Sequence, residues 1–261
     1  MNVVYGFHPV SEALKHNHGN ITRVIIAYGK KGAAEAGLVA AAGEWGIPVI
    51  YQDRKELSRL AGTEAHQGIV ALGQDFRYID LDDLISAKPI EAVSSLLILD
   101  CINDPHNLGS LIRTALCFGV GGIVIPKDRA VGVTPAVIKV SAGAAYQVPI
   151  AQVVNIAATI DRLKERGYWI CGTDASGGRD AARMNLQGSL GIVLGGEHKG
   201  LRPLVKKKCD DILSIPMIGS LDSLNVAVAG AIVIYEVMRC RAGQGAVTEP
   251  QEPNRSIPVK R

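Results

Sequence analysis

Short apolar runs alternate with helix-like segments along the first 73 residues. The apolar runs are rich in β-branched residues and predict strands over 22–28, 48–51 and 68–72. The segments around them predict helices over 9–16, 33–46 and 54–61. Alternation of this kind is typical of a small three-layer α/β unit, so residues 1–73 are expected to form a first domain.

A similar alternation predicts a second domain over residues 94–242. Apolar runs indicate buried strands over 95–100, 121–126, 168–175, 190–196 and 212–217. Helices are predicted within 101–119, from 134 onward, and over 156–167, 201–211 and 223–241. Strands that alternate with helices in this way favour an α/β fold with a doubly wound parallel sheet.

The chain changes texture at two places outside these domains. Residues 74–93 are charged and irregular, and Lys88-Pro89 breaks any helix there, so they are interpreted as an interdomain linker with a short helix. Residues 243–261 hold three prolines and too few apolar residues to pack, which predicts a disordered tail.

The segment 223–241 is unusually apolar for a helix. It has almost no polar residue between Asn225 and Tyr235, so it must be enclosed on several faces, as a central core helix or at a subunit interface. Ala227, Gly230 and Ala231 would allow another helix to pack closely against it.

Charge and cysteine content narrow the class of protein. The net charge of +3 is compatible with an RNA partner without requiring one. The five cysteines are scattered, which favours free thiols in a reducing compartment and argues against a disulfide framework or a zinc site. No signal-like or membrane-spanning run is present in the sequence, so a cytoplasmic location and no membrane partner are expected.

Basic side chains are spread over both domains. Each is most simply a solvated surface residue, but those of the first domain together would suit phosphate contacts with RNA: Arg23, Lys30, Lys31, Arg54, Lys55 and Arg59. Arg179 and Arg183, in a segment interpreted as a surface turn, are further candidates for phosphate contacts. Lys206, Lys207 and Lys208 are better explained as complements to a helix carboxyl terminus.

The stretch LGGEHKGL, residues 194–201, is the strongest candidate for chemistry. A buried strand breaks there at Gly195 and Gly196, which allow positive φ and let a ligand lie against bare backbone, and Glu197 is exposed where the chain turns. Alone, the stretch is equally well a tight turn, and it lacks the ending of a nucleotide P-loop.

Two further segments contain candidate polar groups. In NLGSLIRTA, Asn107 could cap a helix, and Gly109 shares a helix face with Arg113, where the glycine would clear room beside a semi-buried guanidinium. The simpler interpretation is a cap followed by a surface arginine. In SLNVAVAG, Ser223 could be a cap, whereas Asn225 within the first turn has no capping role.

These three segments, in this order, resemble the motifs of the SpoU (TrmH) family of RNA 2′-O-methyltransferases, a branch of the SPOUT superfamily. The motifs are N-x-G-x-x-x-R, G-x-E-x-x-G-L and S-L-N-V-x-x-A. The opening YGFHPVSEAL is similar to the start of a branch that methylates a guanosine of 23S rRNA. The resemblance covers nearly everything except the tail.

The resemblance implies a specific architecture. It implies a carboxyl-terminal domain with a parallel sheet and a deep trefoil knot, which strand and helix patterns alone do not predict. It also implies a small ribosomal-protein-like RNA-binding domain before it, a homodimer, and S-adenosyl-L-methionine as cofactor. By position, the cofactor-binding residues would be Gly195, Gly196, Ile215 and Leu224, largely through backbone groups, and no metal is required.

By the same resemblance, the catalytic residues would be Asn107, Arg113, Glu197, Ser223 and Asn225. Arg113 is expected to activate the 2′-hydroxyl together with a substrate phosphate. A guanidinium normally stays protonated, with a pKa above ~12, so two roles are open. Either burial beside the cationic donor makes it a base, or it stabilises the developing alkoxide while the phosphate accepts the proton.

Three functions are compatible with these motifs and with the family resemblance. The leading one is 2′-O-methylation of a guanosine in 23S rRNA, and the second is the same chemistry on tRNA or another rRNA nucleotide. The third is a non-catalytic RNA-binding or ribosome-assembly factor, against which the presence of all five motif residues argues. A Rossmann-type nucleotide-binding enzyme is disfavoured, because no G-x-G-x-x-G follows the first strand of either domain, and no DNA partner is expected.

Overall fold

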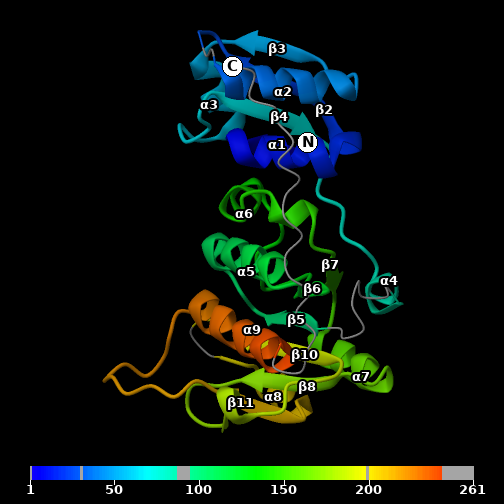
Figure 1. Cartoon of the computed structure of the whole chain (residues 1–261), viewed down its shortest axis with the longest axis vertical. Coiled ribbons are helices and arrows are strands. Elements are labelled where there is room, and N and C mark those ends of the chain that lie inside the picture. Colours follow the sequence, from blue (N-terminus) through cyan, green and yellow to red (C-terminus); the bar gives the residue numbers. More distant parts are fainter. Residues whose placement is uncertain (1, 30–31, 87–94, 198–199, 243–261) are drawn as a thin grey trace, which may run out of the picture.

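The computed structural model describes residues 2–29, 32–86, 95–197 and 200–242, and it contains two separate sheets (Figure 1). The first sheet has four strands in the order β1-β4-β2-β3, with β4 antiparallel to both β1 and β2, and β2 parallel to β3. Its strands are β1 (Asn2–Tyr5), β2 (Ile21–Ala27), β3 (Val49–Gln52) and β4 (Ile69–Gly73). Its helices are α1 (Phe7–His16), η1 (His18–Asn20), α2 (Ala33–Glu44) and α3 (Arg54–Ala61).

Alternation of side chains across this sheet produces the predicted three layers. Val24 and Ile26 of β2 lie in the same hydrophobic cluster as α1 and α2. Ile25 and Ala27, which point to the opposite face, lie in a second cluster with Leu57 of α3. The strand β1 was not predicted from the sequence.

The second sheet has seven strands, all parallel, in the order β7-β6-β5-β10-β8-β11-β9. Its strands are β5 (Ser95–Asp100), β6 (Gly122–Pro126), β7 (Ile150–Val153), β8 (Trp169–Thr173), β9 (Arg179–Asp180), β10 (Leu190–Gly195) and β11 (Asp211–Ser214). The predicted α/β class and parallel sheet are confirmed. The short edge strands β7 and β9 were not predicted as strands.

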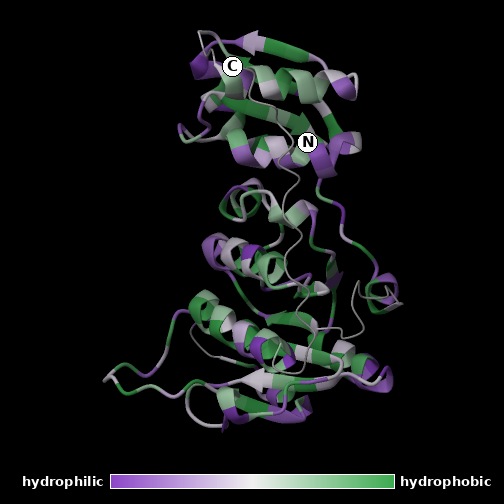
Figure 2. Cartoon of the chain, in the orientation of Figure 1, coloured by the Kyte–Doolittle hydropathy of each residue, from purple (hydrophilic) through white to green (hydrophobic). Residues whose placement is uncertain are grey.

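Helices cover both faces of this sheet. They are α4 (Leu81–Ser86), α5 (Pro105–Cys117), α6 (Pro135–Val140), η2 (Ala144–Tyr146), α7 (Ile156–Glu165), η3 (Ala181–Arg183), α8 (Pro203–Lys208) and α9 (Val226–Ala242). Leu97 and Leu99 of β5 pack with α5, α6 and α9, whereas Leu96 and Ile98 pack with α4, α7 and α8. The central strands β5, β6 and β10 are buried along their whole length, which explains their nearly continuous apolar sequences (Figure 2).

Two glycines let the helices of one face pack closely. A Cβ on Gly230 of α9 would lie 2.5 Å from Leu111 Cδ2 and 2.6 Å from Leu194 Cδ1, so the predicted close packing at this glycine is present. A Cβ on Gly109 of α5 would lie 2.6 Å from Val140 Cβ of α6. Gly109 therefore makes room for α6. The prediction that it clears space beside the Arg113 guanidinium is wrong.

The enclosure predicted for the 223–241 helix is only partly present within one chain. The helix begins at Val226, and its buried residues Gly230, Val233, Ile234 and Val237 form one stripe. Val228 and Tyr235, on its remaining surface, are 49% and 46% exposed. Within a single chain one side of this helix packs in the core, as one of the two predicted roles requires. Its other apolar side is left uncovered.

The segment between the sheets packs on the second sheet. Ile79 forms an isolated bridge with Ala151, and Leu81 and Leu84 of α4 are buried against that sheet. Residues 87–93 of the expected linker lie outside the described residues, as does the expected disordered tail at 243–261.

The first domain contacts the second through α6 and η2. Lys139 Nζ donates to the backbone oxygen of Ala65 at 2.6 Å and lies 4.9 Å from the centre of the Tyr5 ring. Gln147 Nε2 donates to Glu12 Oε2 at 3.0 Å. These polar contacts accompany apolar packing, because buried residues of α1 and β1 lie in the same hydrophobic cluster as buried residues of α6 and η2. None of the helices in the described ranges is long and apolar enough to cross a membrane.

Candidate functional site

Three element ends meet at the carboxyl edge of the large sheet. The loop after β10, the first turn of α5 and the start of α9 are far apart in sequence, and hydrogen bonds between side chains connect them. In a parallel sheet the carboxyl ends of the strands share one edge, which is where open α/β sheets bind ligands. The location therefore agrees with the sequence argument for Glu197.

A chain of hydrogen bonds connects the three predicted motifs. Asn107 Nδ2 donates to Glu197 Oε1 at 2.9 Å, and Asn225 Nδ2 donates to Asn107 Oδ1 at 2.9 Å. The backbone nitrogen of Asp104 also lies 3.4 Å from Glu197 Oε1. Both the nitrogen and the oxygen of the Asn107 side-chain amide are therefore hydrogen-bonded, which fixes the orientation of the side chain.

The helix caps differ from those predicted. Asp104 is the N-cap of α5, accepting from the backbone nitrogen of His106 at 2.8 Å, and Pro105 occupies the first helical position. Asn107 lies inside the helix, only 6% exposed, so the prediction that it caps the helix is wrong.

Asn225 has the capping role that the sequence argument denied it. Its Oδ1 accepts from the backbone nitrogens of Ala227 at 2.9 Å and Val228 at 3.3 Å. The same side chain donates to Asn107, so the cap of α9 is also a bridge to α5. The misjudgement followed from placing the helix start at Ser223, whereas α9 begins at Val226.

The Glu197 carboxylate is held in its ionised form. Partial burial would by itself raise its pKa, but hydrogen bonds from the Asn107 amide and from backbone nitrogens outweigh that effect. The net result is a pKa below the ordinary value for glutamate. At neutral pH Glu197 is therefore an acceptor of hydrogen bonds.

The two motif glycines serve the loop's own backbone. A Cβ on Gly195 would lie 2.2 Å from the carbonyl carbon of Gly200, and one on Gly196 would lie 2.6 Å from the Cys101 oxygen. Neither has a positive φ; in this loop Gly200 does, at +61°. The positive φ that the sequence analysis allowed at these glycines is not used, and their missing side chains instead let the loop fold back on the strand ends.

A cavity of about 500 Å³ opens beside this loop. Its walls include the four predicted cofactor-binding positions, Gly195, Gly196, Ile215 and Leu224, together with Glu197, Ser223 and Asn225. The structure thus brings together eight of the nine predicted site residues, counting Asn107, which is bonded to Glu197. The volume falls within the range of small-molecule sites. His198 and Lys199 of the motif lie outside the described residues.

One wall of this cavity was not predicted from the sequence. It is formed by residues 173–176, at the carboxyl end of β8. Hydrogen bonds from Lys206 and Ser176 lower the pKa of Asp174 to about 2. The available signal was the polar stretch at the carboxyl end of a predicted strand, which was interpreted only as a loop.

A partly buried ion pair fixes the loop that follows the cavity. Asp100, the fully buried last residue of β5, accepts from Arg202 Nε at 2.7 Å and from the backbone nitrogen of Arg202 at 3.0 Å. The Asp100 carboxylate raises the pKa of the Arg202 guanidinium. Because Arg202 directly follows the G-x-E-x-x-G-L motif, this pair anchors the motif to the sheet.

Arg113 lies apart from the cluster within one chain. It is exposed, and no hydrogen bond or ion pair to it is found among the residues described. A helix turns by about 600° over the six residues from Asn107 to Arg113, which places the two side chains on different faces. The prediction of a semi-buried Arg113 is wrong for the single chain.

Comparison with known proteins identifies the family. The profile of the SpoU rRNA Methylase family matches residues 94–235, more than half of the chain. The chain belongs to the SpoU rRNA methylase family. A second profile, RNA 2′-O ribose methyltransferase substrate binding, matches residues 3–79. The motifs that form the hydrogen-bonded cluster are therefore those of a SpoU methylase.

Individual SpoU relatives match nearly the whole chain. A protein of Coxiella burnetii named 23S rRNA (guanosine-2′-O-)-methyltransferase RlmB is 43% identical over 239 residues, covering 91% of this chain and 95% of its own length. A Bacillus subtilis protein named putative TrmH family tRNA/rRNA methyltransferase YacO is also 43% identical, with the same coverage.

Solved structures show the same fold. The SpoU methyltransferase AviRb of Streptomyces viridochromogenes superposes with a TM-score of 0.77 at 25% identity, covering 93% of this chain and 90% of its own. An AdoMet-bound rRNA methyltransferase of Sinorhizobium meliloti has a TM-score of 0.76 at 24% identity, covering 91% of this chain and 87% of its own.

Proposed function

We propose that this chain transfers the methyl group of S-adenosyl-L-methionine to the ribose 2′-hydroxyl of a guanosine in 23S rRNA. The observation that carries the proposal is the convergence of Glu197, Asn107 and Asn225 beside a cavity of about 500 Å³. Support for the substrate comes from the RlmB proteins, whose names give this reaction and which match over 91–92% of this chain. The proposed location is the cytoplasm, which is compatible with an rRNA substrate.

The cavity suits the proposed cofactor. Ile215, Met217 and Val226 supply apolar surface for an adenine ring, and Asp222 supplies a carboxylate suited to cationic sulfonium and ammonium groups. Backbone groups of Gly195, Gly196, Ile215 and Leu224 would hold the cofactor, as the family resemblance implies. When bound, the cofactor supplies an electrophilic methyl group. The deep knot implied for this region stays a prediction.

The role proposed for the hydrogen-bonded cluster of Glu197, Asn107 and Asn225 is to position the target nucleotide. Glu197, ionised and held by Asn107, presents a fixed acceptor for a donor group of the target nucleotide. Asn225 fixes Asn107 from the opposite side, and Ser223 lines the cavity beside it. Alignment of this kind can lower a barrier by roughly 7–11 kcal/mol without any metal.

Arg113 is assigned to a site completed by a second copy of the chain. Its exposed position leaves the guanidinium free to reach outward. The α9 surface that remains uncovered lies beside α5, because Phe118, just after α5, meets Tyr235 with ring centres 6.0 Å apart. Apolar area for a homodimer contact is supplied by Val228 and Tyr235 of α9 and by Leu221, which is 77% exposed.

The proposed role of Arg113 is to stabilise the developing alkoxide. A guanidinium is a poor base because it stays protonated at neutral pH, whereas its fixed charge and five donors suit an oxyanion. The substrate phosphate then accepts the hydroxyl proton. The first domain positions the RNA through phosphate contacts, for which Arg54 and Lys55 at the start of α3 are exposed.

Methyl transfer to defined RNAs tests the proposal. The purified protein is incubated with S-adenosyl-L-methionine carrying a radioactive methyl group and with 23S rRNA, 16S rRNA or bulk tRNA. We expect label in 23S rRNA at one guanosine, located by the block that a 2′-O-methyl group causes in reverse transcription. Label in tRNA or 16S rRNA would reassign the substrate. Binding of RNA without transfer to any of the three would indicate a non-catalytic factor.

A further inference from the structure

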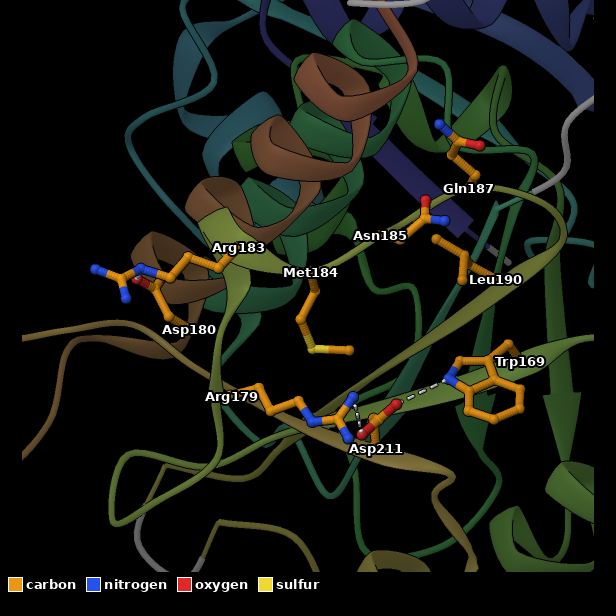
Figure 3. Close-up of a pocket in the computed structure, with 9 residues that line it drawn as sticks. All are labelled: Trp169, Arg179, Asp180, Arg183, Met184, Asn185, Gln187, Leu190 and Asp211. Atoms are coloured by element: carbon orange, nitrogen blue, oxygen red, sulfur yellow. Dashed lines mark hydrogen bonds and ion pairs between the residues drawn. The ribbon is translucent and has the colours of Figure 1, made fainter.

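A second hollow lies at the opposite edge of the large sheet. It has a volume of about 680 Å³, and Trp169, Leu190 and Asp211, which line it, are the first residues of β8, β10 and β11 (Figure 3). Because the strands are parallel, these residues mark the amino edge, whereas Glu197 lies at the carboxyl edge. The six residues of β10 separate the two edges by roughly 20 Å. The hollow is therefore distinct from the proposed methyl-transfer site.

One carboxylate holds an aromatic ring and a guanidinium together there. Trp169 Nε1 donates to Asp211 Oδ2 at 3.3 Å, and Arg179 Nη1 lies 3.3 Å from Asp211 Oδ1. Figure 3 shows the indole and the guanidinium on either side of this carboxylate, with Met184 extending into the space above it. Asp211 is largely buried, so it provides a fixed anchor for both groups.

The two groups remain available to a ligand. Trp169 is 51% exposed and Arg179 71% exposed. The Arg179 guanidinium carries five N–H donors, and its ion pair with Asp211 is made at a single nitrogen, Nη1. Arg183, at the rim, points away from Trp169 toward Asp180 at 3.4 Å. A flat apolar face, free guanidinium donors and the amide of Asn185 thus surround one hollow.

This combination has the chemistry of a site for an unpaired nucleotide. An exposed aromatic face stacks on any base, and guanidinium donors bind the adjoining phosphate. The arginines are balanced by Asp180 and Asp211, so the hollow lacks the dense positive charge that tracks a duplex backbone. Stacking on Trp169 also requires a base that is not enclosed in a helix.

We infer that this hollow binds one unpaired nucleotide of the RNA substrate, with its base on Trp169 and its phosphate on Arg179. The inference rests on the proposed function for the identity of the RNA. It adds a contact about one strand length, roughly 20 Å, from the carboxyl edge where methyl transfer is proposed. The substrate must then present a single-stranded segment as well as the target guanosine.

Tryptophan fluorescence tests the contact directly. The chain has two tryptophans, Trp45 and Trp169, so Trp45→Phe leaves Trp169 as the sole reporter. Titration with hexaadenylate should quench its emission saturably, and an inorganic polyphosphate of similar charge should not. Arg179→Ala in this background should weaken the apparent affinity about tenfold. Lys127→Ala, an exposed lysine after β6 at the other edge, should leave it unchanged.

Methyl transfer to 23S rRNA provides the second measurement. Trp169→Ala should raise the KM for RNA about tenfold, leaving kcat and the KM for S-adenosyl-L-methionine unchanged, and Trp169→Phe should restore most of the loss because it keeps a stacking ring. Unchanged RNA KM in Trp169→Ala, together with no quenching by hexaadenylate, overturns the inference while transfer itself continues. Failure of the wild-type protein to methylate any RNA would instead overturn the proposed function, and the quenching result would still decide whether the hollow binds a nucleotide.

Discussion

A single amide side chain, that of Asn107, connects a carboxylate on one loop with the cap of another helix. It is buried, whereas Glu197 and Asn225 on either side of it are exposed. Removing it would take one partner from each neighbour, but Glu197 keeps backbone donors, Asn225 keeps its bonds to Ala227 and Val228, and both are accessible to water. The energetic consequence is therefore smaller than that of an orphaned buried group.

Asn107→Ala should lower the free energy of unfolding at pH 7 by about 1 kcal/mol. It should also raise the pKa of Glu197, because the side-chain donor that keeps the carboxylate ionised is lost. Urea unfolding and an NMR titration of the carboxyl carbon measure the two effects. Asn103→Ala is the matched control, since that side chain donates to the Cys101 oxygen. An unchanged Glu197 titration in Asn107→Ala would contradict the assignment.

The stability difference should depend on pH in a defined direction. A carboxyl whose folded-state pKa is depressed stabilises the protein above its unfolded pKa of about 4.3, and this contribution is lost as the pH falls through the folded value. Asn107→Ala should therefore differ from wild type more at pH 7 than at pH 3. A difference that grows on acidification would have the wrong sign.

The cysteine thiols should react in an order set by burial. Burial, reinforced by the nearby Asp211 carboxylate, raises the pKa of Cys171 to about 12, and burial raises that of Cys209 to about 11. Cys117 is exposed. Under a thiol reagent at pH 8, Cys117 should be labelled well before Cys171 and Cys209, because the thiolate is the reactive form. Mass spectrometry of labelled peptides gives the order, and rapid labelling of Cys171 in the folded protein would refute it.

At the scale of elements, the crossing of α5 over α6 depends on the missing side chain of Gly109. Gly109→Ala would place a Cβ 2.6 Å from Val140 Cβ. We expect it to destabilise the protein by about 1–2 kcal/mol, since overpacking exceeds the gain in helix propensity. Adding Val140→Ala removes the Cγ1 contact at 2.7 Å but keeps the Cβ, so it should recover only part of this loss.

The chain contains a matched control for that substitution. Gly37 lies within α2, and a Cβ there would meet nothing within 4 Å. Gly37→Ala should therefore stabilise the protein by about 0.5–1 kcal/mol. Thermal or urea unfolding of both variants measures the contrast. Equal effects of the two substitutions would show that packing against Val140 does not matter.

At the scale of the whole molecule, the proposed homodimer can be tested by mixing two inactive variants. Arg113→Ala and Glu197→Ala should each abolish transfer while leaving the fold intact. If Arg113 acts in the site of a second copy, a heterodimer contains one site with both residues native. After unfolding and refolding together, the mixture should regain about a quarter of wild-type activity.

The opposite result has a clear meaning. If Arg113 served the site of its own chain, every site in the mixture would lack one residue and no activity would return. Sedimentation of each variant shows whether self-association is preserved. A Tyr235→Glu variant, which places a charge on the uncovered α9 surface, should dissociate and lose activity together. A monomeric wild-type protein with full activity would exclude the shared site.

The local pattern of apolar and polar residues was sufficient to predict most of the helices and strands. Strand 95–100 and helix 54–61 agree with β5 and α3 residue for residue, because long apolar runs and helical periodicity are local properties. Two-residue β9 is too short to show a period, so it could not be predicted, and four-residue β1 was missed although β3 of equal length was predicted. The start of α9 was misplaced by three residues, and this error hid the cap at Asn225.

The sequence by itself determined the α/β class, the residue ranges of the central strands in both sheets, and the residues that carry the three motifs. Only the tertiary structure decided what those residues do. The glycines turned out to accommodate neighbouring backbone and helices, because such close approaches involve atoms distant in sequence. The meeting of Glu197, Asn107 and Asn225, and the outward position of Arg113, follow from strand order and helix rotation, which no local pattern specifies.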